Sequence, residues 1–178
     1  ASDEWIDDTW YFKSWGGMCK NDWIKVDGIW YYLNEDGTKH ADGWLYYLNN
    51  WYYLKDGGRM AANEWVDYDH NWYYFKNWGG MYHDEWLVLN GTSYYFQNWG
   101  GRYFSTTATI GGKQYTFDEN GRKVSTQTEW TKLASTLKAA KTHNQLIFVS
   151  ASGTTATIAM VTKDADGTWS EDLCTNGY

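Results

Sequence analysis

The sequence has no proline, only two cysteines and no long apolar run. Proline lacks the N–H group that a β-ladder needs, so its absence suits continuous strand pairing. Cys19 and Cys174 lie far apart without a C-x-x-C spacing. This pattern excludes a disulfide framework and a zinc knuckle, and it predicts free thiols and no metal or cofactor. Because a membrane-spanning helix needs about 18 or more apolar residues, we expect no membrane insertion.

Basic residues are also scarce, with 15 Lys and Arg against 22 Asp and Glu and a formal net charge of −7. The acidic excess falls in the first 105 residues, which are also the aromatic part of the chain. Nucleic-acid binding takes most of its affinity from Lys and Arg that neutralise phosphates. We therefore exclude nucleic acid as a partner.

Aromatic residues are abundant, with 14 Trp, 16 Tyr and 6 Phe. An acidic residue or glycine followed by tryptophan recurs at a step that settles at 21 residues. These tryptophans are Trp5, Trp23, Trp44, Trp65 and Trp86. A second aromatic cluster of the type Trp-Tyr-Tyr-Leu follows each of them. The sequence therefore contains about six copies of a 21-residue repeat.

Each repeat has the pattern of a β-hairpin, with short aromatic strands joined by pairs such as Asp27-Gly28 or Asn90-Gly91. Such pairs favour tight turns with positive φ. Because one hairpin is barely stable in water, successive hairpins must stack to bury their aromatic side chains. We expect an all-β solenoid of stacked hairpins over residues 1–124.

Residues 125–178 have a different composition. Trp130, Leu133, Leu137 and Ala140 share one helical face, so we expect a short amphipathic helix over 128–143. Three strand-like runs follow, at residues 145–151, 154–162 and 168–174. We expect a small helix-plus-strands segment that begins a second domain, which either packs on the solenoid or is cut short.

The repeated indoles favour two kinds of ligand. Aromatic cages attract quaternary ammonium groups through cation–π contacts, each contributing roughly 0.5–2 kcal/mol, and exposed indoles also stack on sugar rings. Since strand side chains alternate between faces, about half of these rings must instead form the stacking core. A catalytic site is not expected, because the carboxylates lie at turn positions such as Asp27, Asp36 and Asp56.

The repeat resembles the cell-wall-binding repeats of bacterial surface proteins, which include choline-binding modules and glucan-binding repeats. The resemblance covers residues 4–124. In the choline-binding branch, it implies cages made of two Trp from one repeat, an aromatic residue from the next, and Met. The residues so implied are Trp23, Trp30 and Tyr52, then Trp44, Trp51, Met60 and Tyr73, then Trp65, Trp72, Met81 and Tyr94.

Several residues depart from this pattern. Lys39 stands where methionine is expected in the second repeat, and a cation there would oppose an ammonium ligand. Ser93 replaces the hairpin Trp of the fifth repeat, so no complete cage is expected there. Trp15, Trp78 and Trp99 each precede a Gly-Gly pair and could form a flat platform for sugars.

The C-terminal segment is similar to the opening strands of an L,D-transpeptidase-like catalytic domain. That family uses a cysteine nucleophile in a Ser/Thr-His-Gly-Cys context. Cys174 lies in Leu-Cys-Thr-Asn-Gly, and no histidine precedes a Gly-Cys pair. We therefore expect this chain to have no enzymatic activity.

Together with these patterns, the resemblance implies a secreted, cell-wall-associated module that binds choline groups of teichoic acid. The alternatives are glucan or other glycan binding by aromatic stacking, a purely structural spacer, or the anchoring part of an L,D-transpeptidase. The ligand, the number of occupied sites and the oligomeric state stay open.

Overall fold

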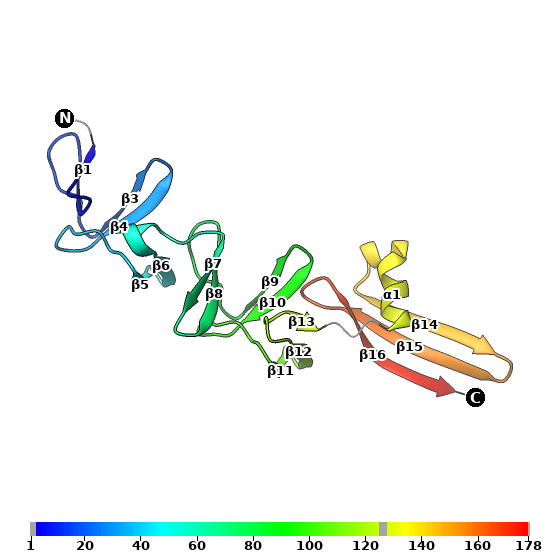
Figure 1. Ribbon diagram of the computed structural model, residues 1–178. Helices are drawn as coiled ribbons and strands as arrows, with labels where there is room; N and C mark the ends of the chain where they lie inside the picture. Colours follow the sequence, from blue (N-terminus) through cyan, green and yellow to red (C-terminus); the bar gives the residue numbers. More distant parts are fainter. Residues whose placement is uncertain (1–2, 125–127, 178) are drawn as a thin grey trace. The chain divides into compact units, whose positions relative to one another are not determined.

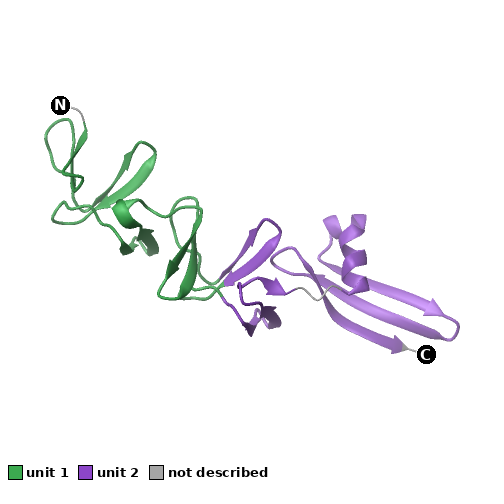
Figure 2. Cartoon of the chain, viewed as in Figure 1, with its two compact units in different colours: residues 1–84, 96–102 green, residues 85–95, 103–178 purple. Residues whose placement is uncertain are grey.

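The computed structural model describes residues 3–124 and 128–177, and these are almost entirely β-structure. The chain forms two compact units, one of residues 1–84 with 96–102, the other of residues 85–95 with 103–178 (Figure 2). The predicted all-β architecture of repeated hairpins is confirmed.

The first unit contains four two-stranded antiparallel hairpins (Figure 1). Their strands are β1 (Glu4–Ile6), β2 (Trp10–Phe12), β3 (Asp22–Val26), β4 (Ile29–Leu33), β5 (Gly43–Tyr47), β6 (Asn50–Leu54), β7 (Glu64–Tyr68) and β8 (Asn71–Phe75). A single 3₁₀ turn, η1 (Asp56–Gly58), follows β6. The first Trp of each repeat pairs with a Tyr across the ladder, as in Trp44 opposite Tyr53.

The hairpin turns are tight because both central residues adopt positive φ. Asp27 and Gly28 have φ of 50° and 84°, which confirms the predicted turn. The equivalent turn of the third repeat uses Leu48 and Asn49, with φ of 45° and 62°. A two-residue turn of this kind matches the twist of the flanking strands, which fixes the register of each hairpin.

The core of the first unit contains one large, completely buried side chain from each of the hairpins β3–β4, β5–β6 and β7–β8. Leu33, Leu54 and Phe75 end their strands with side chains 0% exposed. Phe96 continues the series at the same 21-residue step. Further buried side chains pack around this series, and several of them are aromatic rings that add contact between neighbouring hairpins.

Backbone hydrogen bonds connect each hairpin with the loop that follows the next one. The amide of Met60 donates to the carbonyl oxygen of Trp30, and the amide of Met81 donates to that of Trp51, both at 2.9 Å. These bonds join residues of successive repeats. They therefore bring each methionine to the hairpin that precedes its own.

The second unit contains a hairpin, a three-stranded sheet and a helix-plus-meander segment (Figure 1). Its elements are β9 (Glu85–Leu89), β10 (Thr92–Phe96), β11 (Thr106–Ile110), β12 (Lys113–Phe117), β13 (Lys123–Val124), α1 (Glu129–Thr136), η2 (Lys138–Lys141), β14 (Gln145–Ser152), β15 (Thr155–Lys163) and β16 (Trp169–Gly177). The three predicted C-terminal strands are confirmed as the antiparallel sheet β14-β15-β16.

The predicted helix over 128–143 is wrong in its length. α1 begins after the Thr128 capping box and ends at Thr136, because Leu137 takes an extended backbone with ψ of 143°. Because the helix ends at Thr136, the predicted apolar face of the helix is incomplete, and the side chain of Leu133 is 42% exposed. Ala134, rather than Leu133, packs against Trp169.

Among the described residues, no helix combines the length and apolar character required to cross a bilayer. Cys19 is buried and Cys174 is exposed, and both are free thiols. The resemblance of the C-terminal segment to an L,D-transpeptidase domain stays a prediction.

Candidate functional site: aromatic cages

A cavity of about 370 Å³ lies between neighbouring repeats of the first unit. Its lining is entirely apolar or aromatic and consists of Trp44, Trp51, Tyr73, Met81 and Trp99. The first two come from the hairpin β5–β6, Tyr73 comes from β8, and the last two come from the loops of later repeats. We call this set the Met81 cage.

The rings of the Met81 cage stand nearly perpendicular to one another. The ring centroids of Trp44 and Trp51 lie 6.2 Å apart at 90°, and those of Trp44 and Tyr73 lie 4.8 Å apart at 73°. Trp99 adds a further wall, 6.0 Å from Tyr73 at 76°. Trp51 and Trp99 are 43% and 46% exposed, so the cage has solvent-accessible walls.

Met81 is held in the cage by its backbone and by a glycine. Its amide donates to the carbonyl oxygen of Trp51, and its side chain is buried. Gly100 has φ of +93°, and a Cβ there would lie only 2.3 Å from the sulfur of Met81. The thioether thus takes the space that any larger residue at position 100 would fill.

The same arrangement occurs one repeat earlier, in a set we call the Met60 cage. Its rings are Trp23, Trp30, Tyr52 and Trp78, and the amide of Met60 bonds to the carbonyl of Trp30. Trp23 lies 6.5 Å from Trp30 and 5.0 Å from Tyr52, and Tyr52 lies 6.1 Å from Trp78. Every member precedes its counterpart in the Met81 cage by 21 positions.

The structure brings together the predicted rings of these two groups, but it adds Met60 to the first group, for which no methionine is predicted, and Met81 instead of Met60 to the second. The sequence groups Met60 with Trp44 and Trp51, whereas the structure places Met81 there. The shift follows from the inter-repeat backbone bond, which returns each methionine to the hairpin before its own. Trp78 and Trp99 are additional cage members, and their signal in the sequence is the same 21-residue step.

The predicted third group has a different occupant. The ring centroids of Trp65 and Trp72 lie 6.3 Å apart, close to the separation of the corresponding pairs in the other two cages. The guanidinium of Arg102 lies over both rings, 5.7 Å and 5.9 Å from their centroids. Tyr94, the last predicted member, lies on β10 in the second unit and is half-buried. Sequence reasoning missed Arg102, although it stands 21 residues after Met81.

Lys39 lies in an aromatic group at the start of the chain. Its ammonium is 4.8 Å from the ring centroid of Trp5 and 5.7 Å from that of Tyr31. It also forms an ion pair of 2.7 Å with Asp8. The sequence assigns Lys39 to the second repeat, but the structure places its charge against the rings of the first and second.

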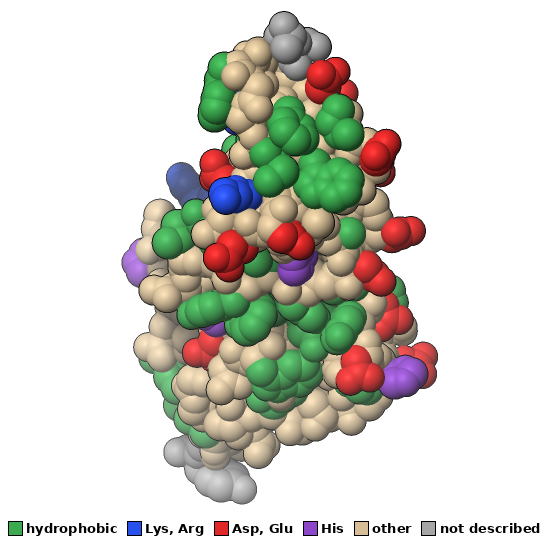
Figure 3. Space-filling view, turned by 90° about the vertical axis from the view of Figure 1, so that its left-hand side faces the viewer, with side chains coloured by type: hydrophobic (Ala, Val, Ile, Leu, Met, Phe, Trp, Pro, Cys, Tyr) green, Lys and Arg blue, Asp and Glu red, His purple; other side chains and the backbone are tan. Residues whose placement is uncertain are grey.

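The walls of the two methionine cages are uncharged. Burial raises the pKa of Tyr52 and of Tyr73 above the ordinary value, so both phenols are neutral at physiological pH. Figure 3 shows hydrophobic side chains beside many Asp and Glu side chains on one face of the molecule, with few Lys or Arg. A neutral aromatic cage in a chain with a net charge of −7 suits a weakly hydrated cation.

Comparisons with known proteins agree with this geometry. Residues 20–65 match the family described as a choline-binding repeat, and residues 63–81 match a putative cell wall binding repeat. No curated protein sequence matches the chain.

Two solved choline-binding structures are similar to the chain. Choline binding protein F from Streptococcus pneumoniae is 30% identical over 67% of this chain and 40% of its own, with a TM-score of 0.58. A structure of CbpF in complex with ipratropium is 33% identical over 69% of this chain and 38% of its own, with a TM-score of 0.57. The chain thus spans less than half the length of either. An alternansucrase in complex with isomaltononaose shares the fold alone, at 15% identity over 94% of this chain and 11% of its own, with a TM-score of 0.52.

Proposed function

We propose that this chain, of which residues 20–65 match the choline-binding repeat family, is a non-catalytic module whose Met60 and Met81 cages bind choline groups of cell-wall teichoic acid. The observation that carries the proposal is the cavity of the Met81 cage, with aromatic walls from three repeats and a thioether beside them. In this role the module holds a secreted protein at the outer surface of a bacterium.

The chemistry of the cage fits a trimethylammonium group. Such a group is bulky and weakly hydrated, so entering an apolar pocket costs little desolvation. Each ring then attracts the cation through its negative face, with roughly 0.5–2 kcal/mol per contact. The perpendicular rings of Trp44, Trp51 and Tyr73 allow a single cation to meet several of them.

Similarity supports the same ligand class. CbpF forms a complex with ipratropium, which carries a quaternary nitrogen as choline does. Ipratropium is a ligand of CbpF. Because the repeats of the two chains are similar, we propose the same class of ligand, a quaternary ammonium, for this chain.

Glycan binding is the second candidate function. The observation that favours it is the exposure of Trp15, Trp78 and Trp99, which are 79%, 48% and 46% exposed. A flat exposed indole can stack on the apolar face of a sugar ring. In this case the ligand would lie on these three exposed indoles, and it would need no positive charge.

The decisive experiment compares choline with its uncharged carbon isostere, 3,3-dimethyl-1-butanol, by calorimetric titration and tryptophan fluorescence. We expect choline to bind, quench the fluorescence and raise the melting temperature by mass action. The isostere should bind at least about tenfold more weakly, because about 1.4 kcal/mol of cation–π attraction is lost. Equal binding of the two ligands would refute the ammonium cage, and binding of an isomalto-oligosaccharide alone would favour the glycan candidate.

Attachment to the cell wall needs its own test. The purified chain should sediment with cell walls that carry choline-substituted teichoic acid, and free choline should release it. Walls without choline should leave the chain in solution. Retention on both kinds of wall, unaffected by choline, would contradict the proposed anchoring.

A further inference from the structure

One position of the repeat distinguishes the cages from one another. Met18 holds the position of Met60 and Met81 in the first repeat, where the described residues contain no earlier hairpin to supply indole walls. The other three repeats have a cation there, namely Lys39, Arg102 and Lys123. Two of them make the same backbone hydrogen bond as the methionines. The amide of Lys39 donates to the carbonyl oxygen of Thr9, and the amide of Arg102 donates to that of Trp72. A Cβ on Gly58 would meet Lys39 at 2.6 Å, just as one on Gly79 would meet Met60 at 2.4 Å.

The charge of Lys39 sits where a ligand's ammonium would be expected. Its Nζ lies over two rings, Trp5 and Tyr31, and pairs with the carboxylate of Asp8. The side chain is only 9% exposed, so the charge is held inside the aromatic group. Two rings and a carboxylate around one nitrogen are a complete cation site.

Arg102 fills the next such site in the first unit. Its guanidinium lies over Trp65 and Trp72, which correspond to Trp44 and Trp51 of the Met81 cage. The guanidinium is planar and stacks well on indole faces. Both indoles are thus already in contact with a cation.

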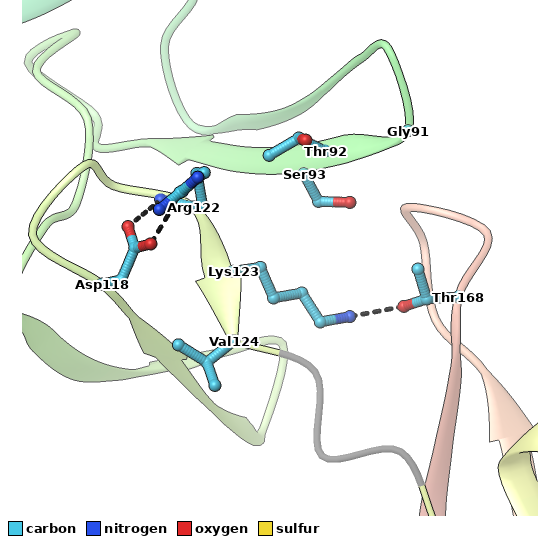
Figure 4. A pocket seen from close by; sticks show the side chains of 8 residues that line it. All are labelled: Gly91, Thr92, Ser93, Asp118, Arg122, Lys123, Val124 and Thr168. Carbon is cyan, nitrogen blue, oxygen red and sulfur yellow. Dashed lines mark hydrogen bonds and ion pairs between the residues drawn. The ribbon is translucent and has the colours of Figure 1, made fainter.

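Lys123 repeats the pattern in the second unit. Its Nζ lies 5.5 Å from the ring centroid of Trp86 and 5.0 Å from that of Tyr115. It also donates to Thr168 at 2.6 Å (Figure 4) and pairs with Asp166 at 2.9 Å. Here the internal cation also ties the C-terminal segment to the last repeat.

We propose that Lys39, Arg102 and Lys123 are internal ligands of their cages, and that this single position decides in each repeat whether a quaternary ammonium can bind. The proposal rests on the function proposed above and specifies its number of sites, which is two. A tethered cation loses no translational freedom on binding, so it competes favourably with free choline. It also repels a second positive charge at the same place.

Other cations near the cages lie differently. Lys25 lies over Trp30 alone, and Lys76 lies over Trp78 and Tyr82, of which only Trp78 belongs to a cage. Neither stands at the methionine position of the repeat. Each of these two lysines contacts a single ring of the Met60 cage, so the remaining rings of that cage stay available to a ligand.

The test is to count choline sites by calorimetry or equilibrium dialysis after exchanging the two residue types. The native chain should bind two choline molecules, Arg102→Met should bind three, and Met81→Arg should bind one. Arg122→Met is the matched control, because Arg122 is exposed and pairs with Asp118 rather than with a ring. It should keep two sites.

The outcomes separate this inference from the function on which it rests. A native chain that binds no choline refutes the proposed function. A native chain with two sites and an Arg102→Met variant that also has two overturns the inference while leaving the function intact. Circular dichroism checks folding, and if Arg102→Met does not fold, Met81→Arg decides: one site supports internal competition and two sites reject it.

Discussion

The backbone amide of Met81 lies 2.9 Å from the carbonyl oxygen of Trp51, in the preceding repeat. This bond places a thioether beside a cage whose first indoles lie on another hairpin. Because the same bond recurs between Met60 and Trp30, the cage is a property of neighbouring repeats and not of any single one. Damage to one cage should therefore stay local.

Trp51→Ala should remove one of two choline sites. The variant loses a wall of the Met81 cage, while all members of the Met60 cage remain. Calorimetric stoichiometry should fall from two to one, with the remaining affinity nearly unchanged. Trp15→Ala is the control, because that indole is 79% exposed and belongs to neither cage. Loss of both sites in Trp51→Ala would contradict the local model.

Gly100→Ala should destabilise the first unit and weaken the Met81 cage. The positive φ of position 100 costs about 1 kcal/mol for alanine. The added Cβ would also meet the sulfur of Met81 at 2.3 Å, and such overpacking costs about 1–3 kcal/mol more. Gly28→Ala isolates the first cost, since its φ is +84° and no atom lies within 4 Å. Equal denaturation midpoints for the two variants would show that Met81 moves aside freely.

Glu64 should make stability depend on acid pH. Burial alone would raise the pKa of this carboxyl, but hydrogen bonds from Arg59 and Lys55 lower it to about 2, from the ordinary 4.5. The folded state is thus favoured above about pH 4.5, and this contribution is lost as the pH falls towards 2. With solvent screening at partners that are 40% and 38% exposed, we expect about 1 kcal/mol.

Glu64→Gln tests this dependence by thermal unfolding. The variant should melt at a lower temperature than the native chain at pH 7, and the difference should close between pH 4.5 and pH 2. Glu35→Gln, at an exposed turn position, is the control and should change little at either pH. A difference that stays constant with pH would exclude the ion pairs as its cause.

Lys123→Met should loosen the C-terminal segment. Asp164 and Asp166 have side chains 1% and 0% exposed and both pair with Lys123. Removing the cation leaves buried charge short of a partner, which costs about 3 kcal/mol. Hydrogen exchange in β14–β16 should speed up at pH 7, and the effect should shrink at acid pH, where a protonated Asp166 needs no cation. Lys132→Met, on the exposed side of α1, should leave exchange unchanged.

The positions of the rings could be read from the sequence because they follow a fixed period. Trp23, Trp44 and Trp65 are each the second residue of a strand, two positions after a residue with positive φ. Short-range turn chemistry sets the register of each strand pair. The helix boundary could not be read in this way. Helix propensity and periodicity continue through Leu137, but the packing of Ala134 and Ala140 against Trp169 accompanies an extended residue between them.

The amino-acid sequence determined the repeat, the hairpins and the aromatic character of the cages, since all three depend on local spacing. The tertiary structure decided which methionine meets which indoles, and where Lys39 and Arg102 direct their charges. Those relationships depend on backbone bonds and ring contacts between different repeats. A periodic sequence contains such partners at every step, and only the three-dimensional packing of one hairpin against the next selects among them.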